Sequence, residues 1–289
     1  MPAAQGLKSR IRSVKNTGKI TGAMQLVAAS KMRRAIDATE ASDPYVEAAN
    51  ELLTYMASQG ATQRHPVFTV RPVKSRLIII IASDKGLAGA YNTNVLRILA
   101  RELLNDRKAG IATEIIAIGK RAANFVTRVK DATVTGVYEN LPDRPSGGEL
   151  YAVLDTVENL FASGRVDAVD VIYTDFLNSL HQQVRVERVL PAGYTSVTVS
   201  ESIREAEYEP GIDEVLDAVA YRLVGAQIFQ ALLDARASEH SMRMVAMKNA
   251  TDNANDLVDD LTLEMNKARQ AAITQELAEI SGGVAALVD

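Results

Sequence analysis

The chain has 289 residues, of which 47% are hydrophobic and 24% are charged, and its formal net charge is −4. This is the composition of an ordinary soluble protein. Cysteine is absent, which excludes disulfides, thiolate metal sites and cysteine nucleophiles. The longest apolar run, at 77–82, is far too short to span a membrane. Charges occupy the N-terminal region where a signal peptide needs apolar residues, so we expect no export signal and a membrane association only through another protein.

Residues 1–58 are predicted to form a long helix with a weak seam for a partner helix. Apolar or small residues recur at alternating spacings of four and three over about seven heptads, which is the pattern of a coiled coil. Small seam residues permit close helix approach but bury little apolar surface. Asp43-Pro44 suits a helix N-cap and first position, so we expect a kink or restart at Pro44. The seam consists of Leu7, Ile11, Val14, Gly18, Thr21, Gln25, Ala28, Met32, Ala35, Thr39, Ser42, Val46, Ala49, Leu53 and Met56.

The middle of the chain alternates between continuous apolar runs and helical patterns. Such runs indicate strands buried on both faces, and strand–helix alternation indicates a largely parallel sheet with helices on both faces. A linker at 58–76 and a polar connection at 192–210 flank this region. The expected strands are 75–83, 113–119, 131–139 and 166–176, with an antiparallel edge strand at 182–191, and the expected helices are 84–106, 120–130 and 146–164.

The final stretch, 212–288, contains almost nothing that stops a helix, because proline is absent after Pro210 and glycine occurs only at Gly225 and 282–283. A helix of this length is a rod of roughly 110 Å, and it needs a partner along its length. Charge favours the other end of the chain as that partner: residues 1–34 carry eight basic and no acidic residues, whereas 201–289 carry 17 acids and 7 bases.

We therefore predict an α/β protein that consists of a long antiparallel coiled coil of N- and C-terminal helices with an inserted Rossmann-like α/β domain. The two helices are expected at 1–58 and 210–289. The domain is expected at 73–192 and should fold apart as a separate lobe.

Several motifs are better explained by structure than by chemistry. The glycine turns at 83–92 and 118–121 match no phosphate-binding motif and are expected to satisfy the geometry of tight strand–helix connections. Asp259 and Asp260 project about 100° apart on a helix and form a solvated face. The first helix lacks the interleaved aromatic residues of a nucleic-acid site, so no nucleic acid is expected. His65, His181 and His240 lack ligand spacing and are expected at the surface or in turns. Asn249, Asn253 and Asp256 are expected to fix the seam register, or else to face a partner.

Three segments carry a resemblance to a known family. KNTGKITGAMQLVAASKMRRA (15–35), SDKGLAGAYN (83–92) and MVAMKNATDNANDLVDDLTLEMNKARQAAITQELAEISGG (244–283) closely resemble the gamma subunit of F-type ATP synthases. A departure is Ala88, where bacterial relatives often carry cysteine, and the cysteine insertion of the chloroplast type is missing. The resemblance implies a non-catalytic rotor shaft without a cofactor. It turns inside a hexamer of alpha and beta subunits and stands beside the epsilon subunit on the ring of c subunits, at the cytoplasmic face of a bacterial cell membrane.

The resemblance also implies roles for individual residues. Met24, Lys31, Arg269 and Gln270 match positions that face the beta subunits. Positions linked to coupling are matched by Arg243, Thr274 and Glu279, and the foot segment that faces the c ring is matched by Tyr208 and Glu209. Two alternatives of other classes are a nucleotide-binding α/β enzyme with helical dimerisation arms, which would bind nucleotide at the Gly86 turn, and a coiled-coil adaptor. No catalytic or metal-binding residue is predicted.

Overall fold

The computed structural model divides the chain into two compact units. Unit 1 comprises Met1–Ala28 and Arg243–Asp289, and unit 2 comprises Ala29–Met242. The described backbone covers residues 2–63, 65–129, 132–143, 145, 148–193, 197–204, 208–209 and 211–288. The described side chains are those of the same residues without 2–4, 42, 43, 45, 46, 63, 202, 213, 279 and 282–288.

The two long terminal helices are present as predicted. Helix α1 spans Pro2–Ser58 and helix α6 spans Ile212–Val288, which makes them 57 and 77 residues long. Of the kink or restart expected at Pro44, the restart is wrong, because α1 continues through this proline, and the kink stays a prediction. A proline removes one main-chain hydrogen bond, and a helix of this length keeps the bonds on either side of the missing one.

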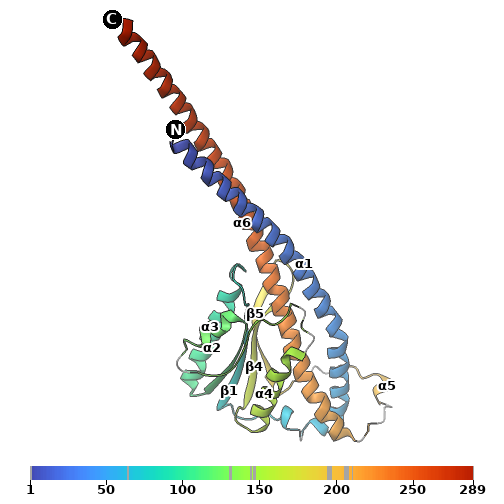
Figure 1. Cartoon of the computed structure of the whole chain (residues 1–289). Coiled ribbons are helices and arrows are strands. Elements are labelled where there is room, and N and C mark those ends of the chain that lie inside the picture. The colour runs from blue at the N-terminus through green and yellow to red at the C-terminus, as the bar shows by residue number, and fades with distance from the viewer. Residues whose placement is uncertain are drawn as a thin grey trace. The chain divides into compact units, whose positions relative to one another are not determined.

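In unit 1, α1 and α6 run side by side in antiparallel directions (Figure 1). Ile11 packs with Val258 and Leu261, whereas Gly18, further along α1, lies against Ala254, which comes earlier in α6. Increasing residue number on one helix thus meets decreasing number on the other. The described seam residues of α1 in this unit are buried or half-buried, which confirms the predicted seam.

Unit 2 contains a five-stranded sheet in the order β3-β2-β1-β4-β5. The first four strands are parallel, and β5 pairs antiparallel with β4 at the edge, as predicted. The central strands are runs of isoleucine and valine, which is typical of strands that are covered on both faces. The bounds are β1 Ser75–Ile81, β2 Ala112–Ile118, β3 Thr133–Tyr138, β4 Ala168–Phe176 and β5 Gln182–Leu190.

Alternate residues of β1 enter two different cores. Ile78 and Ile80 pack beneath helices α2 (Tyr91–Ala109) and α3 (Lys120–Val126). On the opposite face, Leu77, Ile79 and Ile81 pack beneath α4 (Tyr151–Ala162) and α6. Figure 1 shows these two helices beside the sheet. The residues that α6 contributes to this core are Ala220, Val224, Ile228, Ala231, Leu232 and Ala235.

The position of α6 differs from the expectation of a separate lobe, because α6 is itself a layer of the α/β sandwich. Among the described residues, α4 is the one α-helix between β3 and β4, and α6 packs beside it on the same face of the sheet. By length and composition alone, α6 is the one helix among the described residues that could cross a membrane, and 44% of its most apolar window is buried within the protein.

Short elements fill the connections. The expected linker contains two 3-10 turns, Ala61–Gln63 and Pro66–Phe68, and a third, Gly148–Leu150, leads into α4. The polar connection before α6 contains the short helix α5, Glu201–Arg204. The end of α1 and the start of α6 share a small core in unit 2, formed by Leu53, Met56, Leu216 and Leu223.

Candidate functional site

Small side chains hold the helices of unit 1 close together. A Cβ atom placed on Gly18 would lie 3.3 Å from the Cβ of Ala254. One turn further along, the hydroxyl oxygens of Thr21 and Thr251 are 2.7 Å apart, and one of them donates a hydrogen bond to the other. The two helices of unit 1 therefore approach each other closely, and a hydrogen bond between two threonine hydroxyls lies within their seam.

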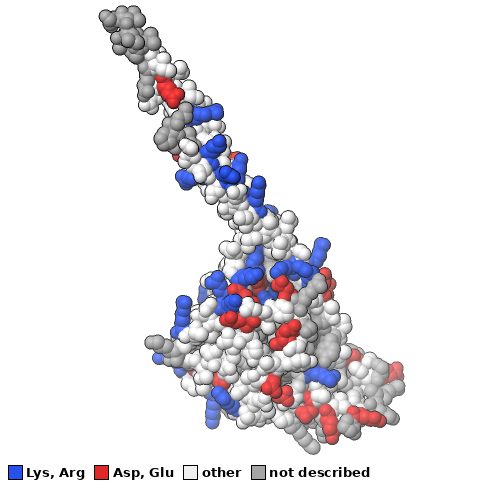
Figure 2. Space-filling model, in the orientation of Figure 1, with Lys and Arg blue, Asp and Glu red and all other residues white. Residues whose placement is uncertain are grey.

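The outer surface of unit 1 is both basic and apolar. Figure 2 shows lysine and arginine side chains gathered along this unit, and the exposed basic residues of α1 there are Lys8, Arg10, Arg12, Lys15 and Lys19. Large apolar side chains are also exposed, namely Ile20, Leu26 and Val27 on α1 and Leu257, Leu263, Ile273, Leu277 and Ile280 on α6. A surface of this composition is suited to contact with other proteins rather than to catalysis.

The residues predicted to face the beta subunits, or to act in coupling, fall into both units. In unit 1, Met24 and Arg243 are half-buried, whereas Arg269, Gln270 and Thr274 are exposed on α6. Thr274 Oγ1 donates to the carbonyl oxygen of Gln270, one turn earlier, at 3.0 Å, so these two share a face. The side chain of Glu279 lies outside the part of the chain that the structure describes.

In unit 2, two of the predicted contact residues have partners within the chain. Lys31 Nζ lies 2.6 Å from Asp143 Oδ2. The ring of Tyr208 stacks on Tyr55 at a centroid distance of 5.8 Å, and its hydroxyl donates to the carbonyl oxygen of Ile203 at 2.9 Å. Burial, with Tyr55 adding to it, raises the pKa of Tyr208. Glu209 is exposed, so of the foot pair it is Glu209 that presents its side chain outward.

The glycine turns serve the chain's own backbone, as predicted. Gly89 has a φ of 55° and Gly119 a φ of 91°, in the left-handed region that glycine tolerates. A Cβ on Gly119 would lie 2.2 Å from the carbonyl oxygen of Ala82. Asp84 Oδ1 accepts hydrogen bonds from the main-chain N–H groups of Lys120 and Asn140, both at 3.1 Å. The N-terminus of α3, which an anion could otherwise approach, is therefore occupied by a carboxylate of the chain itself.

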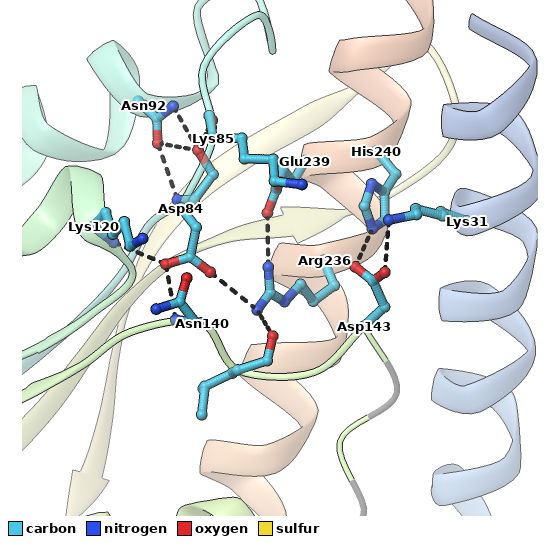
Figure 3. A network of polar contacts seen from close by, with 12 residues as sticks. Lys31, Asp84, Lys85, Asn92, Lys120, Asn140, Asp143, Arg236, Glu239 and His240 are labelled. Atoms are coloured by element: carbon cyan, nitrogen blue, oxygen red, sulfur yellow. Dashed lines mark hydrogen bonds and ion pairs between the residues drawn. The ribbon is translucent and has the colours of Figure 1, made fainter. Parts of the chain in front are cut away.

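A network of charged residues joins the loops at this edge of the sheet to α6 (Figure 3). Arg236 is buried and lies 3.2 Å from Glu239 and 4.0 Å from Asp84, and it donates to the carbonyl oxygen of Leu141 at 3.1 Å. Its position fixes the loops after β1 and β3 against α6.

Asp143 extends the same network to α1 (Figure 3). It lies between Lys31 and His240, with His240 Nε2 3.9 Å from Asp143 Oδ1. Burial alone would raise the pKa of Asp143, but the hydrogen bond and charge of Lys31, with His240 and Arg236 adding to them, lower it overall.

The environments of His240 and of the three polar residues 249, 253 and 256 differ from the sequence predictions. His240 is only 3% exposed, so it is a buried member of the network and not a surface or turn residue, although His65 and His181 do lie in turns. Asn249, Asn253 and Asp256 are exposed, so they do not fix the seam register, and the alternative that they face a partner remains. Among the described residues, no group of three or more histidine or acidic side chains could hold a metal ion.

Sequence reasoning missed Asp84, Asp143, Arg236 and Glu239. The only local signal was a group of charges in the otherwise apolar segment 231–240 of α6. Their partners lie on loops about 100–150 positions earlier in the sequence, so helical periodicity could not indicate them.

Comparison with known proteins agrees with this arrangement. A family model described as ATP synthase matches residues 3–287. ATP synthase gamma chains from two strains of Chloroflexus aurantiacus are 41% identical over 290 residues, which cover 99% of this chain and 99% of each relative. Among solved structures, a chain of the central stalk and c ring of the Tetrahymena thermophila mitochondrial ATP synthase has a TM-score of 0.64 at 26% identity and covers 80% of this chain and 99% of that one. A chain of the Euglena gracilis mitochondrial ATP synthase has a TM-score of 0.72 at 18% identity, with coverage of 99% and 95%.

The helix pair, the α/β unit and these relatives together define a non-catalytic central-stalk subunit of a rotary ATP synthase. The exposed basic and apolar surface of the helix pair suits a subunit that acts by contact with other subunits. The chain belongs to the ATP synthase gamma chain family.

Proposed function

We propose that this chain couples ion flow through the membrane sector to ATP synthesis and hydrolysis by rotating inside the alpha/beta hexamer. The observation that carries the proposal is the antiparallel helix pair of unit 1, with its close small-residue seam and its exposed basic and apolar surface. Long hydrogen-bonded helices transmit torque, whereas a pocket is not needed for this purpose.

The mechanism rests on differential contact. An asymmetric pair of helices presents a different side to each of three otherwise equivalent beta subunits. Each beta subunit is taken to have a state of high and a state of low nucleotide affinity. A contact with the shaft shifts the balance between these states only by the difference between its interaction free energies with the two states. The chain thereby drives catalysis and regulates ATPase activity and proton flow without supplying a catalytic residue.

The contact residues carried over from the family belong to this proposal. Met24, Arg243, Arg269, Gln270, Thr274 and Glu279 face the beta subunits or act in coupling, and the exposure of Arg269, Gln270 and Thr274 supports this assignment. Lys31 is also assigned to contact with the beta subunits, and its side chain is held in place by the ion pair with Asp143. Glu209 meets the c ring, and Tyr208 positions that segment through its stack on Tyr55.

The remaining parts of the proposal concern organisation and place. The helices at 1–58 and 210–289 act as the shaft, and the α/β domain at 73–192 carries contacts to the epsilon subunit and the c ring. The assembled complex places the chain at the cytoplasmic face of the bacterial cell membrane, which it reaches only through its partners.

Reconstitution tests the main proposal. The chain is combined with purified alpha and beta subunits of a bacterial enzyme, and ATPase activity is measured together with rotation of a bead fixed to unit 2. We expect activity and stepwise rotation only when the chain is present. Full activity without it, or activity without any rotation, would contradict the proposal.

Met24→Lys tests the coupling surface. The variant places a positive charge at a half-buried position of α1. There it can form an ion pair with a beta subunit, and this pair would stabilise one rotational state of the complex over the others. We expect fewer protons pumped per ATP hydrolysed, with ATP hydrolysis itself largely kept. Met24→Leu, which preserves apolar volume, is the matched control and should pump normally. Equal pumping by all three chains would refute the role of Met24.

A further inference from the structure

A stretch of helix α6 within unit 2 is buried all round its axis, although most of its residues are polar. The six consecutive residues 236–241 are each at most 8% exposed. A helix that packs on a single neighbour buries one face only, so the chain must surround α6 here, and it must also satisfy the buried polar groups. The polar residues of this segment are Arg236, Ser238, Glu239, His240 and Ser241.

Four separate segments at the carboxyl edge of the sheet hold this polar segment. Ser238 Oγ donates to the carbonyl oxygen of Thr174, near the end of β4, at 3.0 Å. Ser241 Oγ donates to the carbonyl oxygen of Ser179, in the turn between β4 and β5, at 2.9 Å. The guanidinium group of Arg236 contacts the loops after β1 and β3 (Figure 3). The polar contacts of the segment thus come from several directions around the helix.

The contacts of α6 with the sheet just before this segment are of a different kind. There the helix packs through Ala220, Val224, Ile228 and Ala231. Apolar contact is non-directional, so such a stripe holds a helix against a sheet without selecting one rotation about its axis or one position along it. Hydrogen bonds weaken steeply when their geometry changes, and buried polar residues in a helix interface can fix its register.

We propose that the polar segment 236–241 sets the rotation and the axial position of α6 on the sheet. Its members are positioning residues, because they act through the helix and not on a substrate. The segment ends beside Met242, the last residue of unit 2, and α6 continues from there as one helix into unit 1. The proposal rests on the proposed function in one respect: in a rotating subunit, this register decides how a turn of the α/β unit is passed on along the helix.

Distances between spin labels in the isolated chain test the register. Cysteine is absent from the chain, so labels attach only to cysteines introduced as Lys108→Cys on α2 and Arg222→Cys on α6, at two exposed positions. The test variant combines Arg236→Met with Glu239→Met, which removes the buried charges and keeps apolar volume. We expect one narrow distance distribution for the original chain. For the variant we expect a broader or second distribution, displaced by up to about 5.4 Å, one helical turn.

Two further variants keep this test decisive even if the first one does not fold. Ser238→Ala combined with Ser241→Ala removes two hydrogen bonds at little change in volume and should broaden the distribution to a smaller extent. Arg101→Met, which removes an exposed cation beside Glu102, is the control and should leave the distribution unchanged. The same narrow distribution in all chains, or equal broadening in the control, would overturn the proposal. A lower urea midpoint without any change in distance would do so too, because the segment would then only stabilise the fold.

A rotation measurement connects the register with the shaft. The chain is assembled with alpha, beta and epsilon subunits, the head is immobilised, and a bead on Lys108→Cys reports the angle of unit 2. In the absence of ATP, we expect the angular variance to be roughly twofold larger for Ser238→Ala with Ser241→Ala, because fewer directional contacts restrain the helix. Arg101→Met should show the original variance.

The outcomes of the two measurements are distinguishable. Unchanged angular variance in the serine variant would refute the role of the segment in passing on rotation. If the original chain did not turn the bead when ATP is added, the proposed function would fail instead, and the label distances in the isolated chain would still decide whether 236–241 sets the register of α6.

Discussion

In unit 2, strands β1 and β2 bury side chains as large as isoleucine on both faces, and charged residues such as Arg76 and Arg236 are buried among them with partners. In unit 1, α1 and α6 meet through glycine, alanine and threonine, and large apolar side chains such as Leu26 and Leu277 remain exposed. Buried apolar area is the main source of folding free energy, so unit 2 is stabilised by its own core. Unit 1 gains less folding free energy from buried apolar area, and part of its apolar surface stays available for contact with partners.

The largest expected effect on this contrast comes from Arg76→Met in unit 2. The guanidinium group of Arg76 lies 3.0 Å from Glu102, 3.1 Å from Asp106 and 2.8 Å from Asp170. The substitution leaves these carboxylates without their shared cation, and removing one partner of a buried ion pair typically costs about 3–5 kcal/mol. Urea unfolding followed by circular dichroism measures the loss.

Arg101→Met is the control for that experiment. The side chain of Arg101 is 64% exposed and lies 3.8 Å from Glu102, so its loss should cost less than about 1 kcal/mol. If the free energy of unfolding fell by the same small amount in both variants, the buried ion pairs of Arg76 would not stabilise unit 2 more than an exposed pair does.

A smaller effect is expected from Gly18→Leu in unit 1. A Cβ at this position already approaches Ala254 to 3.3 Å, so a larger side chain must separate the helices. Overpacking costs about 1–3 kcal/mol, partly offset by the higher helix propensity of leucine, about 1 kcal/mol. Hydrogen exchange of the backbone amides at 247–258 should become faster.

Gly6→Leu is the matched variant on the same helix. No atom lies within 4 Å of a Cβ placed on Gly6, so only the gain in helix propensity applies, and exchange at 247–258 should not increase. Equal acceleration by both variants would show that the small-residue seam is not what holds unit 1 together.

The smallest effect concerns Asp167, which precedes β4 in unit 2. Its Oδ2 accepts from the N–H groups of Lys74 at 2.9 Å and Ser75 at 3.0 Å, and these bonds, with Arg71 and Lys74 nearby, lower the pKa of Asp167. A carboxyl whose folded pKa is lowered stabilises the fold above its unfolded pKa, and this contribution is lost as the pH falls through the folded pKa.

Asp167→Asn should therefore reduce the free energy of unfolding by about 1 kcal/mol at pH 7, the difference between a charged and a neutral hydrogen-bond acceptor. The difference between the variant and the original chain should shrink as the pH falls below about 4, where free aspartate protonates. Urea unfolding at pH 7 and at pH 3 gives the comparison. A gap of the same size at both values would rule out the charge of Asp167 as its source.

The sequence was most informative where a local pattern determines the structure. The continuous apolar run that contains Ile78 and Ile80 specified a buried strand, and the spacing of Ile11 and Ala28 specified a seam, because both patterns follow from the period of the backbone. The contact residues of the helix pair came from the resemblance alone, since exposed positions such as Arg269 and Gln270 have no periodic signature.

The features that sequence reasoning missed depend on distant parts of the chain. His240 lies on α6 and has the same neighbours in sequence whether it is exposed or buried, whereas Asp143, which lies beside it in the structure, belongs to the loop after β3. The role of α6 as a layer of the sandwich was missed for a similar reason. An apolar stripe on a helix predicts that it packs, but it does not select a helix or a sheet as the partner.

The double membership of α6 has a consequence for protein engineering. Residues 212–242 of this helix belong to unit 2, and Ala220, Val224 and Ile228 lie against its sheet. A minimal shaft made by deleting 73–192 and joining the two helices would leave this apolar stripe bare, and such a product would self-associate. Replacing the stripe with glutamate and lysine, or starting the C-terminal helix of the shortened protein at Arg243, would remove the exposed apolar surface.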